Sequence, residues 1–118
     1  MDEWERLPLF ATQERLDRRV LRAQAAMRRT HDAWRLAASL DVLGLGVMPD
    51  LRPRLAACDA RITLVAGADD GRFVECAGEM AAQLPRATVA IVPRRGHNVP
   101  LEAPGAVADR IEEGIDDE

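Results

Sequence analysis

Two residues of this chain, Asp70 and His97, have the types and the setting of an acid–base pair. Asp70 follows the apolar run ITLVAG, which ends at a glycine before two carboxylates. His97 follows a second apolar run, VAIVP, and stands in a Gly-His-Asn turn ahead of a new helix start. A carboxylate that accepts a hydrogen bond from one imidazole nitrogen fixes the tautomer of the ring, and the other nitrogen can then take a proton. The two residues therefore have the order and the chemistry of the acid and the base of a serine-type triad.

Each of the two residues also has an ordinary structural explanation. Asp70 can be the N-cap of the helix that follows it, and His97 can be a solvent-exposed loop residue. Asp69 is the other carboxylate at this turn, and the residues alone leave open which of the two acts; if Asp70 is the acid, Asp69 is a turn residue. The only serine, Ser39, has no glycine beside it, whereas the nucleophile of such a triad stands in a G-x-S-x-G turn. Because both strand ends lead to one edge of a sheet, we expect the pair to be functional and its serine to lie upstream of Met1.

The elements that position this pair are predicted from apolar periodicity and from glycine and proline residues that interrupt it. The first part of the chain is predicted to be helical, and Trp34 is expected to pack within it. The second part alternates strand and helix. The first predicted helix covers residues 12–29 and is capped by Thr12. The second covers 32–43, is capped by Thr30 or Asp32, and is ended by Gly44 and Gly46 in the left-handed conformation. The other predicted helices are a short one from Asp50 to 56, one over 72–84 and one that begins at Pro104. The predicted strands are 61–66 and 88–92.

The order strand, helix, strand makes a βαβ unit, whose two strands run parallel. Apolar strands of this kind occur where both faces of a sheet are covered. A sheet of two parallel strands has two open edges and little cover. We therefore expect a fold of the α/β class whose sheet needs strands that this chain does not supply.

The composition excludes several classes of function. The chain has 118 residues, a net charge of −4 and a pI of about 5.2, which gives no reason to expect a nucleic-acid partner. Its two cysteines have neither CxxC spacing nor nearby histidine pairs, so we expect neither a zinc site nor a disulfide framework. We also predict no other metal ion and no cofactor. The acidic N-terminus does not have the pattern of a signal peptide, and no apolar run reaches the roughly 18 residues of a membrane helix. We therefore predict a cytoplasmic protein that binds no membrane.

Four stretches of the chain resemble the motifs of one family. They are EWERLPLFAT, similar to a lid segment in which tryptophan precedes Q/L-P-x-F; RLAASLDVLGLGVMPDL, similar to the closing helix of the lid; LVAGADDGRF, similar to G-E-x-D-x-K-F; and PRRGHNVPLEAP, similar to G-H-N-x-x-x-E-x-P. This family is the 2-succinyl-6-hydroxy-2,4-cyclohexadiene-1-carboxylate synthases of menaquinone biosynthesis, which have the α/β-hydrolase fold. The resemblance extends from Trp4 to the C-terminus. Ala68 and Arg72 depart from the family's usual glutamate and lysine.

The resemblance implies a partial α/β-hydrolase fold. A helical lid would cover residues 1–50, and a C-terminal βαβα unit with two parallel strands would cover residues 51–118. The family's first strands, its oxyanion-hole loop and its nucleophile turn have no counterpart in this chain. The resemblance therefore implies a truncated gene, an internal start or one half of a split enzyme. It also implies that the chain is inactive without a partner, the N-terminal half that carries the serine.

The resemblance further implies roles for individual residues. The triad acid is placed on Asp70 and the triad base on His97. Arg28 matches a lid arginine that holds a substrate carboxylate, and Trp4 matches an aromatic residue that contacts the substrate. In such enzymes the serine acts as a base that starts the elimination of pyruvate, and the ring gains a conjugated diene. The implied substrate is a small carboxylated molecule.

Two other functions stay open on the sequence alone. The same fold would suit a carboxylester or thioester hydrolase, which would not need Arg28 to bind a multiply carboxylated substrate. A non-catalytic interaction module could also use the βαβ unit and bind a partner strand at its open edges. We favour the synthase portion, since nothing in the sequence protects the expected edges.

Overall fold

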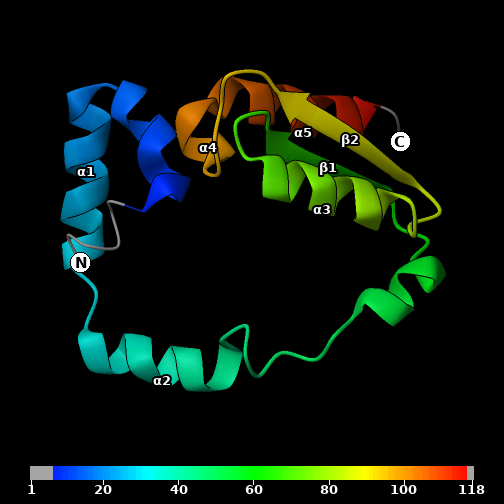
Figure 1. The fold of residues 1–118 in the computed structure, drawn as a ribbon, viewed down its shortest axis with the longest axis horizontal. Helices are drawn as coiled ribbons and strands as arrows, with labels where there is room; N and C mark the ends of the chain where they lie inside the picture. Colours follow the sequence, from blue (N-terminus) through cyan, green and yellow to red (C-terminus); the bar gives the residue numbers. More distant parts are fainter. Residues whose placement is uncertain (1–6, 117–118) are drawn as a thin grey trace. The chain divides into compact units, whose positions relative to one another are not determined.

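The computed structural model describes residues 7–116, which divide between two compact units. One unit consists of the residues up to Arg15 together with Arg54–Glu118, and the other is Leu16–Pro53. Figure 1 shows the order of the elements along the chain. The predicted boundary between a lid at 1–50 and a βαβα unit at 51–118 stays a prediction.

The unit Leu16–Pro53 contains two helices, α1 (Arg18–Arg29) and α2 (Ala33–Leu43). Asp17 caps α1 by accepting from the backbone N–H of Arg19 at 2.6 Å. Asp32, one of the two predicted caps, holds the start of α2 by accepting from the N–H of Arg35 at 2.9 Å. Gly44 follows α2 with extended backbone angles of φ −65° and ψ 149°. The predicted left-handed ending is therefore wrong at this residue.

The predicted single helix over residues 12–29 is also wrong. The chain forms a 3-10 helix, η2 (Pro8–Arg15), before α1 begins at Arg18. Thr12 caps nothing, because its hydroxyl donates to the distant carboxylate of Glu102 at 2.9 Å. A long-range contact thus replaces the local cap that the periodicity predicted.

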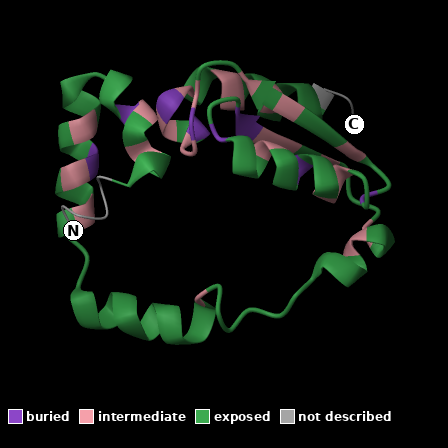
Figure 2. Ribbon diagram, in the orientation of Figure 1, coloured by how far each residue is buried: buried purple, intermediate pink, exposed green. Residues whose placement is uncertain are grey.

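Several large apolar residues of α1 and α2 are exposed, and Figure 2 shows α2 coloured as exposed. Trp34 is 86% exposed, so the expectation that it packs within the helical part is wrong. No residue of α2 is buried. The other large exposed apolar residues on these helices are Val20, Met27, Leu36, Leu40, Val42 and Leu43. Within the unit Leu16–Pro53, this apolar surface is therefore left uncovered.

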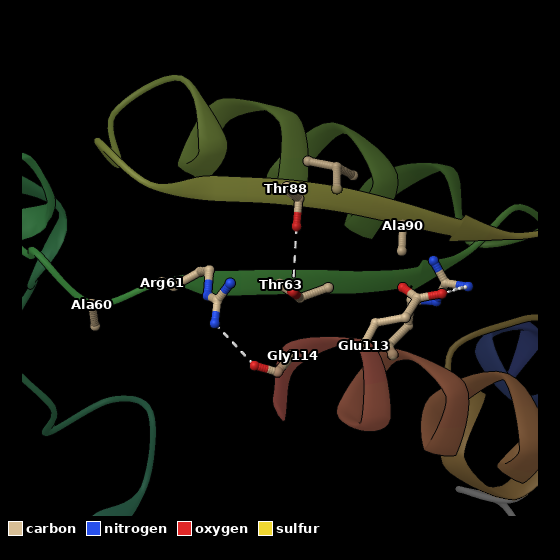
Figure 3. Close-up of a pocket in the computed structure, with 9 residues that line it drawn as sticks. Ala60, Arg61, Thr63, Thr88, Ala90, Glu113 and Gly114 are labelled. Carbon is tan, nitrogen blue, oxygen red and sulfur yellow. Dashed lines mark hydrogen bonds and ion pairs between the residues drawn. The ribbon is translucent and has the colours of Figure 1, made fainter. Parts of the chain in front are cut away.

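The predicted βαβ unit is confirmed. Strands β1 (Ile62–Gly67) and β2 (Ala87–Val92) pair in parallel, with Ile62 opposite Ala87 and Gly67 opposite Val92. Helix α3 (Gly71–Ala81) connects them and packs on both strands. Two more helices, α4 (Val99–Glu102) and α5 (Pro104–Asp116), follow β2, and a 3-10 helix, η3 (Arg52–Ala57), precedes β1. Helices α3 and α5 lie on opposite sides of the sheet (Figures 1 and 3).

The apolar core of this unit is small. Ala66, Ala77, Leu84 and Val99 are its buried hydrophobic residues. On the α5 side of the sheet, the hydroxyls of Thr63 and Thr88 lie 3.3 Å apart, at a groove of about 550 Å³ that Figure 3 shows. The sheet is therefore only partly covered on this side.

None of the helices in residues 7–116 has both the length and the apolar character needed to cross a membrane. The cytoplasmic location stays a prediction.

Candidate active site

The carboxyl ends of the two strands hold the candidate site. The backbone N–H of Ala68 donates to the carbonyl of Val92 at 2.9 Å, and that of Asp69 donates to the carbonyl of Arg95 at 2.8 Å. These bonds extend the parallel pairing into the loops. A side chain at Gly67 would collide with the carbonyls of Arg95 and Gly96. The loop after β2 therefore lies directly on the end of β1, as expected for a site at this edge of a parallel sheet.

Asp70 and His97 are brought into direct contact at this edge. Asp70 Oδ2 lies 2.7 Å from His97 Nδ1. An ionised carboxylate only accepts hydrogen bonds, so Nδ1 carries the hydrogen and Nε2 is the nitrogen left to exchange protons. The carboxyl side chain is 6% exposed and the imidazole is 32% exposed. The pair therefore combines a buried acceptor with a ring that solvent and ligands can reach.

Asp70 also has the structural role that the sequence left open. Its Oδ1 accepts from the backbone N–H of Phe73 at 3.3 Å and so caps α3. The cap uses one carboxylate oxygen and the pair with His97 uses the other. The two explanations of this residue hold together, and the cap fixes the carboxylate in the orientation that the imidazole needs.

Asp69, the neighbouring carboxylate, pairs with a different residue. Its Oδ2 lies 2.9 Å from Arg15 Nη1, and both side chains are substantially exposed. Exposed ion pairs of this kind contribute little to stability. Asp69 thus contacts the end of η2 and not the imidazole.

Two aromatic rings pack beside the imidazole, and the sequence did not single them out as site residues. The rings of Phe73 and His97 have centroids 4.5 Å apart at an interplanar angle of 60°. Phe10, from η2, lies 6.5 Å away at 71°. Edge-to-face contacts at these separations are favourable. They restrict rotation of the ring and leave the hydrogen bond to Asp70 to set its direction.

Glu102 is a further buried carboxylate at the site that sequence reasoning missed. One of its oxygens accepts from the N–H of Gly96 at 2.8 Å, and the other accepts from the hydroxyl of Thr12 at 2.9 Å. Its place in the G-H-N-x-x-x-E-x-P motif was the one signal that could have found it, but periodicity alone gives it no role.

The structure does not test the two predicted substrate-binding residues. Trp4 lies outside the described residues. Arg28 lies in the last turn of α1, in the unit Leu16–Pro53. Their roles stay predictions. Within residues 7–116, no group of histidine, cysteine, aspartate and glutamate side chains could hold a metal ion.

Known proteins with sequences similar to this chain are named as synthases of one kind. A putative 2-succinyl-6-hydroxy-2,4-cyclohexadiene-1-carboxylate synthase of Bacillus subtilis strain 168 is 34% identical over 101 residues, which are 86% of this chain and 37% of the relative. The 2-succinyl-6-hydroxy-2,4-cyclohexadiene-1-carboxylate synthase of Escherichia coli strain SMS-3-5 is 34% identical over 105 residues, 89% of this chain and 38% of the relative. The predicted relationship to this synthase family is confirmed. No protein-family model matches the chain.

The solved structure of MenH from S. aureus supports the same conclusion at the level of the fold. It matches with a TM-score of 0.94 at 28% identity, over 98% of this chain and 44% of that one. The predicted partial α/β-hydrolase fold is therefore confirmed. The chain spans less than two fifths of the length of the synthases from B. subtilis and E. coli, at 37% and 38%.

Proposed function

We propose that this chain forms the lid and the acid–base part of a 2-succinyl-6-hydroxy-2,4-cyclohexadiene-1-carboxylate synthase, a lyase of menaquinone biosynthesis. The observation that carries the proposal is the 2.7 Å contact between Asp70 Oδ2 and His97 Nδ1 at the carboxyl edge of the sheet. The similarity to named synthases over 86% of the chain supports the choice of reaction.

In this proposal, Asp70 orients the imidazole and His97 is the base. Nε2 takes the proton of a serine hydroxyl, and Asp70 stabilises the imidazolium that forms. The serine oxygen then removes a proton from the ring of the substrate. The electron pair of that C–H bond forms a new ring double bond, the double bond already in the ring shifts, and the ring C–O bond to the enolpyruvyl group breaks. The leaving group departs as the enolate of pyruvate and takes the proton held by the imidazolium, which gives pyruvate and returns His97 to its neutral form, while the ring gains a conjugated diene.

The serine in this scheme comes from another segment. Ser39, the only serine of the chain, lies in α2 and has no flanking glycine turn. We propose that an α/β segment with a G-x-S-x-G turn completes the site, whether it belongs to the same polypeptide or to a separate one. Arg28 and Trp4 would bind the carboxylated substrate, and the scheme needs no cofactor.

Reconstitution tests this function. The chain is mixed with the Ser-bearing segment of a related synthase, and pyruvate release from the synthase substrate is measured. We expect activity only in the mixture, because the nucleophile and oxyanion donors provide most of the transition-state stabilisation. His97→Ala should abolish it, whereas His31→Ala, the matched control, should not. Turnover by the 118 residues alone would disprove the need for a second segment.

A substitution at Arg28 distinguishes a synthase from an ester hydrolase. A synthase needs cations for a multiply carboxylated substrate, and losing one charge-assisted contact is expected to raise KM roughly 10- to 100-fold. Arg28→Ala is compared with Arg29→Ala in the reconstituted enzyme. Unchanged KM together with good turnover of carboxylesters would favour the hydrolase instead.

A further inference from the structure

The buried carboxylate of Glu102 connects parts of the site that are far apart in the sequence. It is 6% exposed, and each of its oxygens accepts one hydrogen bond. The donors are the backbone N–H of Gly96 at 2.8 Å and the hydroxyl of Thr12 at 2.9 Å. A buried charge is costly unless it is hydrogen-bonded. The two bonds therefore account for the presence of a carboxylate inside this small core.

The bond to Gly96 acts directly on the backbone of the proposed base, because Gly96 precedes His97. The chain after the histidine is held by Asn98, whose side chain accepts from the N–H of Leu101 at 3.3 Å at the start of α4. The carboxylate of Glu102 sits at the other end of the same short helix. The turn that carries the imidazole is thus closed on both sides by bonds within six residues.

The bond to Thr12 extends this arrangement to η2. A side chain at Gly96 would collide with Thr12, so the 3-10 helix and the histidine turn lie in close contact. The same 3-10 helix brings Phe10 to the imidazole and Arg15 to Asp69. Placement of the ring therefore depends on η2 being docked.

We propose that Glu102 is a positioning residue. It holds the Gly96–His97 turn so that Nδ1 faces Asp70 and Nε2 is free for proton transfer, and through Thr12 it couples that placement to η2. A leucine in its place offers no acceptor, so the Gly96 N–H and the Thr12 hydroxyl both lose their partner. The catalytic consequence rests on the proposed function, but the effect on the imidazole does not.

Nitrogen NMR of the two histidines tests this proposal on the 118-residue chain. In the wild type, the Nδ1 and Nε2 signals of His97 should be those of the ring protonated on Nδ1. In Glu102→Leu they should shift toward the positions of mixed tautomers, and the Gly96 amide proton should shift upfield. His31, in α2's flanking turn, should keep its signals and serves as the internal reference.

Substitutions at Thr12 keep the test decisive if Glu102→Leu does not fold. Thr12→Val removes only the hydroxyl and should shift the His97 signals in the same direction, whereas Thr12→Ser should restore them. Unchanged His97 signals in a folded Glu102→Leu chain, or identical signals in the valine and serine variants, would overturn the proposal. No substrate is involved, so failure of the reconstitution experiment leaves this result standing, and the reverse also holds.

Discussion

At the scale of single residues, the two oxygens of Asp70 have separate tasks. Oδ1 caps α3 through the N–H of Phe73, and Oδ2 accepts from Nδ1 of His97. The cap stabilises the fold, and the pair with His97 takes part in the proposed chemistry. Substitutions can therefore separate the two contributions.

Asp70→Asn should remove activity while sparing stability. An amide oxygen still caps a helix as well as aspartate does, but the amide NH₂ now faces Nδ1 and favours the wrong tautomer. We expect kcat of the reconstituted enzyme to fall by about 10⁴-fold, as for a triad acid replaced by its amide. Asp70→Ala should in addition cost about 1 kcal/mol of unfolding free energy through the lost cap. Asp69→Asn is the control, and an equal loss of kcat there would contradict the assignment.

Asp50 provides a pH-dependent prediction away from the site. Hydrogen bonds from the Arg52 side chain and backbone lower the pKa of Asp50 to about 2. The contribution of this pair to stability is present above the unfolded pKa of about 3.9 and is lost as the pH falls through the folded value. In an NMR titration, Arg52→Gln should return the Asp50 pKa toward about 3.9. Arg54→Gln should leave it low, and a low pKa in both variants would refute the Arg52 side chain as the cause.

At the scale of elements, the site depends on how closely the loop after β2 approaches the end of β1. Gly67→Ala would push a methyl group into the carbonyls of Arg95 and Gly96, and crowding of this kind costs about 1–3 kcal/mol. Gly78, in α3, has nothing within 4 Å of the same added atom, so Gly78→Ala should stabilise by about 0.5–1 kcal/mol through helix propensity. Denaturant unfolding measures both changes. Equal changes in unfolding free energy at the two glycines would show that the close approach of the loop after β2 to the end of β1 does not restrict the side chain at residue 67.

The elements also show how much of the fold could be predicted from the sequence. Both strands and α3 were predictable, because apolar runs between glycine and proline specify them locally. The contact of Asp70 with His97 followed from the rule that parallel strands end at one edge. The start of α1 was not predictable, because Thr12 bonds with Glu102, 90 residues away. Glu102 was missed for the same reason, since only the folded chain brings its partners together.

At the scale of the whole molecule, the sheet is narrower than sheets that are stable by themselves. Val89 and Ile91 of β2 are among the exposed large hydrophobic residues, and the Thr63–Thr88 face borders an open groove. These surfaces agree with the proposal that an α/β segment completes the sheet. The alternative of a non-catalytic interaction module predicts that the Ser-bearing segment leaves the open edge of β1 unprotected.

Hydrogen exchange along β1 distinguishes these two outcomes residue by residue. The N–H groups of Ile62 and Ala68 donate toward β2, to the carbonyls of Arg86 and Val92. Because the bonds of a parallel ladder alternate along a strand, the N–H of Leu64 also points to β2, whereas those of Thr63 and Val65 point to the open edge.

In the chain alone, the Thr63 and Val65 amides should therefore exchange much faster than the Leu64 amide. Adding the Ser-bearing segment should slow exchange at Thr63 and Val65, because a strand pairing there removes their N–H groups from water, and should change Leu64 far less. A uniform slowing at all three residues would indicate general stabilisation and not strand addition. Pyruvate release without any added protection of Thr63 and Val65 would mean that the partner completes the site from another side, and the proposed continuation of the sheet would be wrong.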